Sequence, residues 1–329
     1  MKAIYDADID VSILAGRPIG LLGFGAQGRA HALNLRDSGA DVRVGLRHGS
    51  PSAGDCAALG LTVAAPEAVA EAAEVVVMLV PDEVQPALYR DVLAPRMKPG
   101  GALVFAHGYS IHYGQVTPRA DLDVVLVAPL GIGDQVRRTY EAGNGVPALL
   151  AVHRDATGSA RERALAYAGL NGHGRAGVLP TTFADETETD LFAEQAVLCG
   201  GVTHLITAAF DTLVEAGYPE ELAYFGCLHE LKLITDLIHA RGIAGMRRSI
   251  SSTAEYGDYT RGPRVIPEAS REGLRSLLED IRSGRFAEEL AAETGAGAPT
   301  LAAGRRAADA HPIEEVGARL RAMMPWLEN

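Results

Sequence analysis

Two acidic side chains at helical spacing could together bind a divalent metal ion. Asp190 and Glu194 are four residues apart in a segment with helical periodicity, so both carboxylates are expected on one helix face. Like charges repel there, whereas hard cations such as Mg²⁺ bind one or two carboxylates together with water and substrate oxygens. The same spacing is also common on helix faces that only contact solvent. The pair alone therefore leaves a metal site and a solvated surface both open.

Three further polar residues are candidates for the same chemistry. Glu230 lies in a second helical segment with mainly apolar neighbours, His107 follows a short aliphatic run, and Ser251 lies in a serine-rich turn. A glutamate beside an apolar stripe is informative, because such side chains are seldom buried unless they are paired. His107 or Ser251 alone would more often be an ordinary hydrogen-bonding residue.

A glycine-rich turn predicts a dinucleotide site near the N-terminus. The aliphatic run Pro18–Leu22 leads into a G-x-G-x-x-G motif made of Gly23, Phe24, Gly25, Ala26, Gln27 and Gly28. The first glycine permits a tight turn, the second lets the backbone approach a pyrophosphate, and the third lets the following helix pack closely on the sheet. The amides and the dipole at the helix N-terminus favour an anion there. The alternative is a glycine turn that binds no nucleotide.

The end of the second expected strand indicates the type of cofactor. NAD-binding domains usually carry an acidic residue there for the ribose 2′-hydroxyl. This chain instead has Arg47, Ser50 and Ser52, a cation and two hydroxyl donors that suit a 2′-phosphate, so we predict NADPH. The alternative for these residues is a solvated loop. Asp82 and Gln85 follow the next long aliphatic run, at the sheet edge where ligands bind in this fold.

Continuous aliphatic runs that alternate with helical segments predict the fold that positions these residues. Such runs indicate strands buried on both faces, as in a parallel sheet covered by helices. The first half is therefore predicted as an α/β, Rossmann-type, doubly wound parallel sheet. Helices are expected at Ala26–Ser38 and Pro66–Glu71. The predicted strands are Pro18–Leu22, Asp41–Leu46, Val75–Leu79, Ala102–Ala106, Val124–Ala128 and Ala148–His153.

The second half has few β-branched runs and has the pattern of consecutive helices, so we expect an all-α domain. The pattern changes from alternating strands and helices to consecutive helices near Leu179–Ala184, and no low-complexity linker separates the two parts. The predicted domains are therefore residues 1–181 and 182–329. A chain of 329 residues also exceeds the usual size of one hydrophobic core. The predicted helices include Thr189–Leu198, Val202–Ala216, Pro219–Ala240 and Glu268–Ser283.

The composition excludes several other classes of protein. Apolar residues make up 47% of the chain, which excludes a disordered protein. With 30 Lys plus Arg against 42 Asp plus Glu the net charge is −12, so neither nucleic acid nor an anionic membrane is an expected partner. No uninterrupted apolar run reaches the length of a membrane helix, and the acidic N-terminus is unlike a signal peptide. Reduced thiols and a cytoplasmic location are indicated by three cysteines without metal-binding spacing, Cys56, Cys199 and Cys227.

Taken together, the motifs resemble those of the ketol-acid reductoisomerase family in its short bacterial form. The resemblance extends from Tyr5 to Trp326. It implies a Mg²⁺-dependent alkyl migration in a 2-acetohydroxy acid, followed by reduction of the resulting 2-keto acid with NADPH, in branched-chain amino-acid biosynthesis. It also implies a knotted helical domain that forms the dimer interface. The blocks that carry it are Gly23–Gly28, His31–Arg36, Pro81–Gln85, Ala106–Gly108, Ile111–His112, Glu186–Phe192, Glu194–Gly201, Leu228–Lys232 and Thr253–Tyr259.

The resemblance also implies a role for most of the candidates. Asp190 and Glu194 correspond to metal ligands of one subunit, and His107 corresponds to the family's active-site histidine. Glu230 and Ser251 correspond to a metal ligand and a substrate contact supplied by the other subunit. We therefore expect a homodimer or a larger homo-oligomer that acts on a small molecule. The cofactor contacts correspond to Phe24–Gln27, Arg47, Ser50, Ser52, Asp82–Gln85 and Gly133.

Two positions depart from the family pattern where its chemistry takes place. Leu130 replaces the active-site lysine and Gly226 replaces one of the metal-binding glutamates, so a cation and an anion are lost together. Gly226 frees volume, while Leu130 and Ile132 make the expected substrate region more apolar. Alkyl migration needs two closely held Mg²⁺ ions, whereas hydride transfer needs mainly a positioned nicotinamide. Migration should therefore suffer more, and the second Mg²⁺ site should be weakened.

Three functions remain as hypotheses. The first is a divergent family member that reduces a C=O or C=N bond and has little or no alkyl-migration activity. Its substrate would be a small molecule, bulkier than the usual substrate of the family. The second is an ordinary ketol-acid reductoisomerase that converts 2-acetolactate. The third is a non-catalytic NADP(H)-binding homologue. The retained His107, Asp190, Glu194 and Glu230 argue against a complete loss of chemistry.

Overall fold

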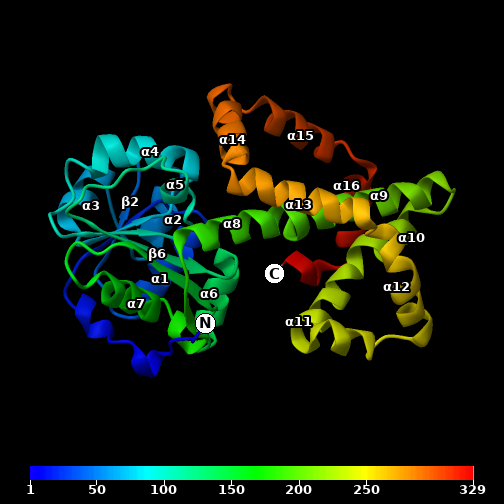
Figure 1. Ribbon diagram of the computed structural model, residues 1–329, viewed down its shortest axis with the longest axis horizontal. Coiled ribbons are helices and arrows are strands. Elements are labelled where there is room, and N and C mark those ends of the chain that lie inside the picture. Colours follow the sequence, from blue (N-terminus) through cyan, green and yellow to red (C-terminus); the bar gives the residue numbers. More distant parts are fainter. Residues whose placement is uncertain (329) are drawn as a thin grey trace. The chain divides into compact units, whose positions relative to one another are not determined.

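The computed structural model describes residues 1–328, and the chain divides into two compact units (Figure 1). The first unit spans Met1–Thr189 and the second begins at Asp190. The first contains all the strands of the described chain, and the second is helical throughout. The predicted order of an α/β domain followed by an all-α domain is therefore confirmed.

One eight-stranded sheet forms the centre of the first unit, in the order β3-β2-β1-β4-β5-β6-β7-β8. Neighbouring strands are parallel except for β6 and β7. Because β1 lies between β2 and β4, the chain changes its direction of travel across the sheet at β1, which is where ligands bind in doubly wound folds. The strands are β1 (Ile19–Leu22), β2 (Val42–Gly45), β3 (Thr62–Ala64), β4 (Val75–Met78), β5 (Ala102–Phe105), β6 (Asp123–Pro129), β7 (Ala148–Arg154) and β8 (Val178–Pro180).

The observed sheet agrees with six predicted strands and differs in two respects. The sequence does not predict β3 and β8, which have only three residues each. The expectation of an all-parallel sheet is wrong at β7. After β6 the chain passes through α6 (Gly133–Glu141) and returns to the same edge, so that Pro129 pairs with Ala148 in an antiparallel ladder.

Apolar side chains fill both faces of the sheet. All residues of β1, β4 and β5 are buried. One cluster joins alternate strand residues to α1 (Ala26–Asp37) and α7 (Ala160–Leu170). The cluster on the other face involves α3 (Pro66–Ala72) and the π-helical turn η4 (Tyr89–Leu93). Burial on both faces explains why these strands are uninterrupted aliphatic runs.

The remaining helices of the first unit are short, and each follows a strand of the parallel part of the sheet. Their N-termini therefore lie at the carboxyl edge of the strands, where the candidate cofactor residues also lie. They are α2 (Ser52–Ala58), α4 (Gln85–Leu88), α5 (Tyr109–His112) and α6 (Gly133–Glu141).

The second unit is an assembly of helices with a small core of its own. Buried Phe210 and Tyr224 pack with Ile313, Val316 and Leu320. The knot implied by the family resemblance stays a prediction. The helices are α8 (Phe183–Ala193), which crosses the boundary between the units, α9 (Gly200–Glu215), α10 (Glu220–Tyr224), α11 (Leu231–Arg247), α12 (Ser252–Val265), α13 (Glu268–Arg282), α14 (Arg285–Gly295), α15 (Pro299–Asp309) and α16 (Pro312–Arg321).

Two π-helical turns interrupt these helices, and the predicted Pro219–Ala240 helix is divided by one of them. The turn η6 (Glu194–Leu198) is closed by a bond from Cys199 N to the carbonyl of Glu194, and η7 (Phe225–His229) by a bond from Glu230 N to the carbonyl of Phe225. Turns of this kind are rare and often occur at functional sites. Both adjoin a predicted metal ligand.

The helical stretch Phe183–Glu215 is long and apolar enough to cross a membrane, by length and composition only. Its most apolar 18-residue window has a mean hydropathy of 1.5. The stretch includes Asp190, Glu194 and Gln195, so it is not an uninterrupted apolar run and agrees with the expectation from the sequence. Only 6% of that window is buried within the single chain. Core and interface helices of globular proteins pass the same test.

Candidate active site

The glycine-rich loop between β1 and α1 has the close contacts that a dinucleotide cradle requires. Gly23 has a φ of +109°, and a Cβ there would lie 2.6 Å from the carbonyl oxygen of Leu79. A Cβ on Gly28 would lie 2.5 Å from the carbonyl oxygen of Gly23. At Gly25, the N-cap of α1, the space is open. The loop therefore packs closely against Leu79 at Gly23, while the helix N-terminus at Gly25 is open. This arrangement fits a bound pyrophosphate.

The loop between β6 and α6 packs directly against this cradle. The side chain of Gln27 donates a hydrogen bond to the carbonyl of Gly131 at 2.7 Å. A Cβ on Gly133 would meet the carbonyl carbon and oxygen of Ala26 at 2.3 Å, so only glycine fits there. The same loop presents two exposed apolar side chains, since Leu130 is 52% and Ile132 is 71% exposed. An apolar surface therefore borders the candidate cofactor site.

The other predicted cofactor residues lie on the loops after β2 and β4. Arg47 is exposed in the turn that precedes α2, and the amide of Ser50 bonds to the carbonyl of Arg47 at 3.1 Å. Ser52 begins α2. Gln85 is buried and donates to the carbonyl of Val80 at 3.1 Å and to Asp82 Oδ1 at 2.9 Å. Gln85 therefore fixes the conformation of the loop that carries Asp82.

A buried glutamate that the sequence did not single out orients the candidate histidine. Glu186 on α8 is 3% exposed, and its Oε1 lies 3.0 Å from Nδ1 of His107. The backbone N–H of Gly108 donates to Oε2 of the same carboxylate at 2.7 Å. A Cβ on Gly108 would lie 2.8 Å from that oxygen, so the close approach requires glycine. The one signal in the sequence is the position of Glu186, one helical turn before Asp190.

His107, Glu186 and Asp190 form a group that could contact a metal ion. Each offers a ligand atom, and these atoms lie within 4.8 Å of one another. Glu186 is already engaged with the turn after β5, whereas Asp190 is exposed. The carboxylate of Asp190, followed one turn later by the exposed Glu194, supplies the hard oxygen donors that Mg²⁺ prefers. The two carboxylates therefore fit the predicted Mg²⁺, and His107 lies close to Asp190.

The other predicted residues lie in the second unit and are exposed in the single chain. Glu230 is exposed in the single chain, although its apolar neighbours Leu228 and Leu231 are partly buried. Gly226 lies within the π-helical turn η7, and a Cβ there would meet no atom within 4 Å. Ser251 is the N-cap of α12, and its Oγ accepts a bond from the amide of Ala254 at 3.2 Å. The implied contribution of Glu230 and Ser251 to a partner's site stays a prediction.

Comparison with known proteins identifies the family. The NADPH-binding domain of acetohydroxy acid isomeroreductase matches residues 13–177, and the C-terminal domain of ketol-acid reductoisomerase matches residues 183–326. The chain belongs to the ketol-acid reductoisomerase family. It is thus an NAD(P)H-dependent oxidoreductase with an N-terminal Rossmann-type domain, as predicted.

Solved structures support the same assignment. An NADH-preferring ketol-acid reductoisomerase from an uncultured archean is 42% identical, with a TM-score of 0.96, over 98% of this chain and 99% of that chain. More distant similarities show the fold alone. A semialdehyde dehydrogenase NAD-binding protein from Cupriavidus necator is 20% identical over 81% and 99% of the two chains, with a TM-score of 0.59. A pyrroline carboxylate reductase from Plasmodium falciparum is 14% identical over 82% and 98%, with a TM-score of 0.50.

Proposed function

We propose that this member of the ketol-acid reductoisomerase family catalyses the family's reaction, with alkyl migration in a 2-acetohydroxy acid followed by reduction with NAD(P)H. The observation that carries the proposal is the 42% identity over 98% of the chain to a protein whose name states that activity. This identity supports the complete family reaction more strongly than it supports a divergent reductase without alkyl migration. The retained His107, Asp190 and Glu194 agree with it.

The residues of the candidate site would divide the work of this reaction among them. The amides of the glycine-rich loop would bind the cofactor pyrophosphate, and NAD(P)H would supply the hydride. Asp190 and Glu194 would hold Mg²⁺, which would supply the polarisation of the substrate oxygens. Glu186 fixes the imidazole of His107 through Nδ1, so that Nε2 is the nitrogen that exchanges a proton with the substrate.

A second candidate, reduction without migration, is favoured by Gly226 and Leu130. Neither residue is imposed by local packing, because the space beside Gly226 is open and Leu130 is half-exposed. Gly226 is also absent from the glycines with positive φ, so its backbone conformation accepts a side chain. A glycine inside a helix costs up to about 1 kcal/mol relative to alanine. The fold therefore does not require the loss of a carboxylate and a cation at these positions, which supports the second candidate.

One experiment separates the two candidates. Purified protein is supplied with NADPH and Mg²⁺, and either with 2-acetolactate or with the isomerised 2-keto acid, 3-hydroxy-3-methyl-2-oxobutanoate. Comparable turnover of both substrates supports the complete reaction. Turnover of the 2-keto acid with little turnover of 2-acetolactate supports reduction alone. No turnover of either, with a bulkier 2-keto acid and a cyclic imine also inert, contradicts both.

NADPH is the proposed cofactor, in preference to NADH. Arg47, Ser50 and Ser52 support this choice, because the loop offers a guanidinium and two hydroxyl groups to a 2′-phosphate and no acidic group to a ribose. The preference of the archaeal relative for NADH belongs to that protein. Mg²⁺ is the proposed metal, for the hard oxygen ligands described above.

A homodimer in the cytoplasm is the proposed state of the protein. Large apolar side chains remain exposed on the second unit of the single chain, among them Val197, Leu198, Leu205 and Leu222. A second copy of the helical unit would remove this surface from water. Light scattering coupled to size-exclusion chromatography tests the dimer, and a monomeric mass at micromolar concentration would contradict it.

A further inference from the structure

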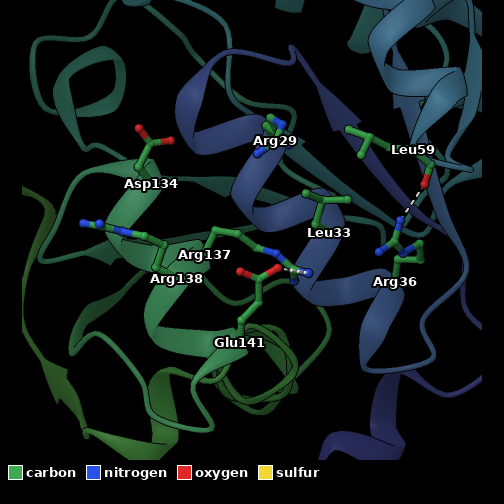
Figure 2. Close-up of a pocket in the computed structure, with 8 residues that line it drawn as sticks. All are labelled: Arg29, Leu33, Arg36, Leu59, Asp134, Arg137, Arg138 and Glu141. Atoms are coloured by element: carbon green, nitrogen blue, oxygen red, sulfur yellow. Dashed lines mark hydrogen bonds and ion pairs between the residues drawn. The ribbon is translucent and has the colours of Figure 1, made fainter. Parts of the chain in front are cut away.

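Four arginines line a pocket on the first unit that shares no residue with the candidate active site (Figure 2). Arg29 and Arg36 come from α1, and Arg137 and Arg138 come from α6. The pocket has a volume of about 390 Å³, which is within the range of small-molecule sites. Its position between two packed helices makes it a fixed feature of the sheet domain.

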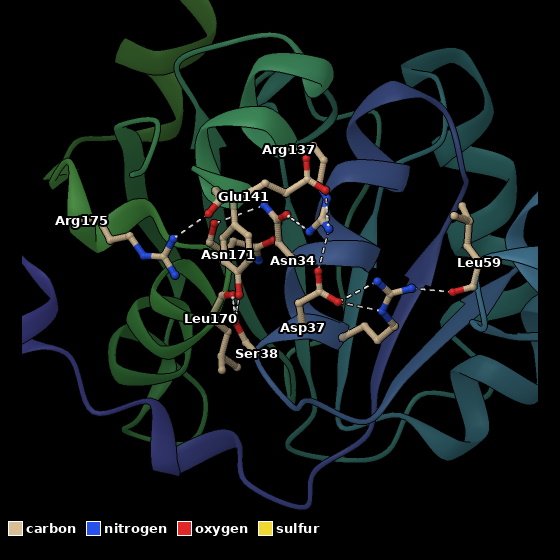
Figure 3. Close-up of polar contacts among 11 residues, drawn as sticks. Asn34, Asp37, Ser38, Leu59, Arg137, Glu141, Leu170, Asn171 and Arg175 are labelled. Carbon is tan, nitrogen blue, oxygen red and sulfur yellow. Dashed lines mark hydrogen bonds and ion pairs between the residues drawn. The ribbon is translucent and has the colours of Figure 1, made fainter. Parts of the chain in front are cut away.

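Two of the guanidinium groups are held in place by hydrogen bonds (Figure 3). Arg137 is 12% exposed and donates to Asp37 at 2.6 Å and to the side chain of Asn34 at 2.9 Å. Arg36 pairs with the same Asp37 at 2.7 Å and donates to the carbonyl of Leu59. The shared carboxylate therefore fixes two cations at one wall of the pocket, which lowers the entropy lost when a ligand binds.

The other two guanidinium groups are not committed to protein partners. Within residues 1–328, the side chains of Arg29 and Arg138 make no hydrogen bond or ion pair, and both are exposed. Four arginines face Asp37, Asp134 and Glu141, so the local charge is 4 − 3 = +1 in a chain with a net charge of −12. The pocket is thus a positive site on an acidic protein.

We propose that this pocket binds a phosphate group, either of inorganic phosphate or of a phosphate monoester. Arginine side chains offer pairs of N–H donors that match phosphate oxygens, and these charge-assisted bonds are among the strongest in proteins. The volume exceeds that of a phosphate ion, and Leu33 and Leu59 supply an apolar wall for an organic part. This proposal is independent of the reaction that the enzyme catalyses.

Calorimetric titration of the NADPH-saturated protein with inorganic phosphate and with AMP tests the proposal. Saturation with NADPH fills the cofactor site, so that phosphate binding there does not contribute. We expect saturable binding of at least one of the two ligands at one site per chain. Tighter binding of AMP identifies a phosphate monoester as the better ligand, and equal binding identifies the phosphate group alone.

The double variant Arg29→Ala/Arg138→Ala should weaken this binding at least tenfold, because it removes both uncommitted donors. The matched control is Arg305→Ala/Arg306→Ala on α15, which removes the same charge from two exposed arginines and should leave the affinity within about twofold. The variant Arg29→Lys/Arg138→Lys keeps the charge and should bind with intermediate affinity. Absence of binding to the NADPH-saturated protein, or equal affinity in the pocket variant and the control, would overturn the proposal.

Discussion

Nδ1 of His107 lies 3.0 Å from Oε1 of Glu186, and the second oxygen of that carboxylate accepts the backbone N–H of Gly108 at 2.7 Å. Glu186 thus binds both the imidazole and the turn that carries it. Because the carboxylate is buried behind His107, we expect it to act through the histidine as a positioning residue. Such outer partners fix the tautomer and the ring orientation of the histidine that they contact.

The variant Glu186→Gln should therefore lower kcat by roughly tenfold to a hundredfold, with a smaller change in the KM of the cofactor. The amide no longer stabilises a proton on the imidazole, so the pH–rate profile should also move to lower pH. Steady-state kinetics from pH 6 to pH 9 measure both effects. Glu188→Gln on the same helix is the control, since Glu188 pairs with His112 at 3.4 Å. An unchanged pH profile in Glu186→Gln would contradict the positioning role.

The double variant Leu130→Lys/Gly226→Glu should raise the turnover of 2-acetolactate more than either single change. Each substitution restores a charge that needs the opposite charge nearby, so their effects should not be additive. The open space beside Gly226 and the exposure of Leu130 admit both side chains. Ile132→Lys adds a cation to the same exposed loop and is the control. Turnover by the unmodified protein equal to that of the double variant would show that neither charge is needed.

The kcat/KM for NADPH should exceed that for NADH by roughly tenfold to a hundredfold, the value expected for one charge-assisted contact to a phosphate. Arg47→Ala should bring the two values close together by weakening NADPH selectively. Arg161→Ala, which removes an exposed arginine on α7, is the control and should preserve the ratio. Steady-state rates with both cofactors measure the ratio. An equal or better value with NADH in the unmodified protein would refute the preference.

Mg²⁺ should bind tightly to no more than one site per active centre in the NADPH complex. Gly226 supplies no carboxylate, whereas Asp190 and Glu194 retain their oxygens. Calorimetric titration should show this site weakened at least tenfold in Asp190→Asn and unchanged in Asp185→Asn, which alters an exposed carboxylate in the first turn of the same helix. Two tight sites would show that another group replaces the missing glutamate.

The sequence predicts the sheet well because its central strands are buried on both faces. The run Val75–Met78 is aliphatic for this reason, and the glycine motif marks the turn that follows β1. The edge strands β3 and β8 are missed because they are short, with an exposed Thr62 in one and Pro180 in the other. Aliphatic content also carries no information about strand direction, which is why the antiparallel pairing of β7 was not predicted.

The candidate site is less completely predictable. Spacing places Asp190 and Glu194 on successive helical turns, but it gives no sign that Glu186 is buried against His107. That contact joins residues far apart in the chain, through a turn where only Gly108 permits the approach. The π-helical turn that begins at Glu194 depends on a single shift of the backbone hydrogen-bond register, which residue types do not specify.

Two buried histidines behind the sheet should make the stability of the protein depend on pH. His31 and His173 are fully buried, and Nδ1 of His31 is hydrogen-bonded to the hydroxyl of Tyr167 at 2.6 Å. Burial, together with the nearby His173, lowers the pKa of His31 to about 3. Burial lowers the pKa of His173 to about 4, although a bond to the carbonyl of Val146 opposes the shift.

Both folded-state pKa values lie below the value of about 6.5 for an unfolded histidine, so the unfolded chain binds protons first as the pH falls. Above about pH 6.5 both histidines are neutral in the folded and unfolded states, and they do not change the free energy of unfolding. Below that pH, the free energy of unfolding decreases by about 1.4 kcal/mol per pH unit and per histidine, until the folded-state pKa is reached. Thermal unfolding between pH 7.5 and pH 5 should show this loss. His31→Gln should lower the Tm at pH 7.5 but make it less dependent on pH, whereas His48→Gln, at an exposed position, should reproduce the unmodified curve. A pH dependence that is identical in His31→Gln and the unmodified protein would exclude His31 as a source of the acid sensitivity.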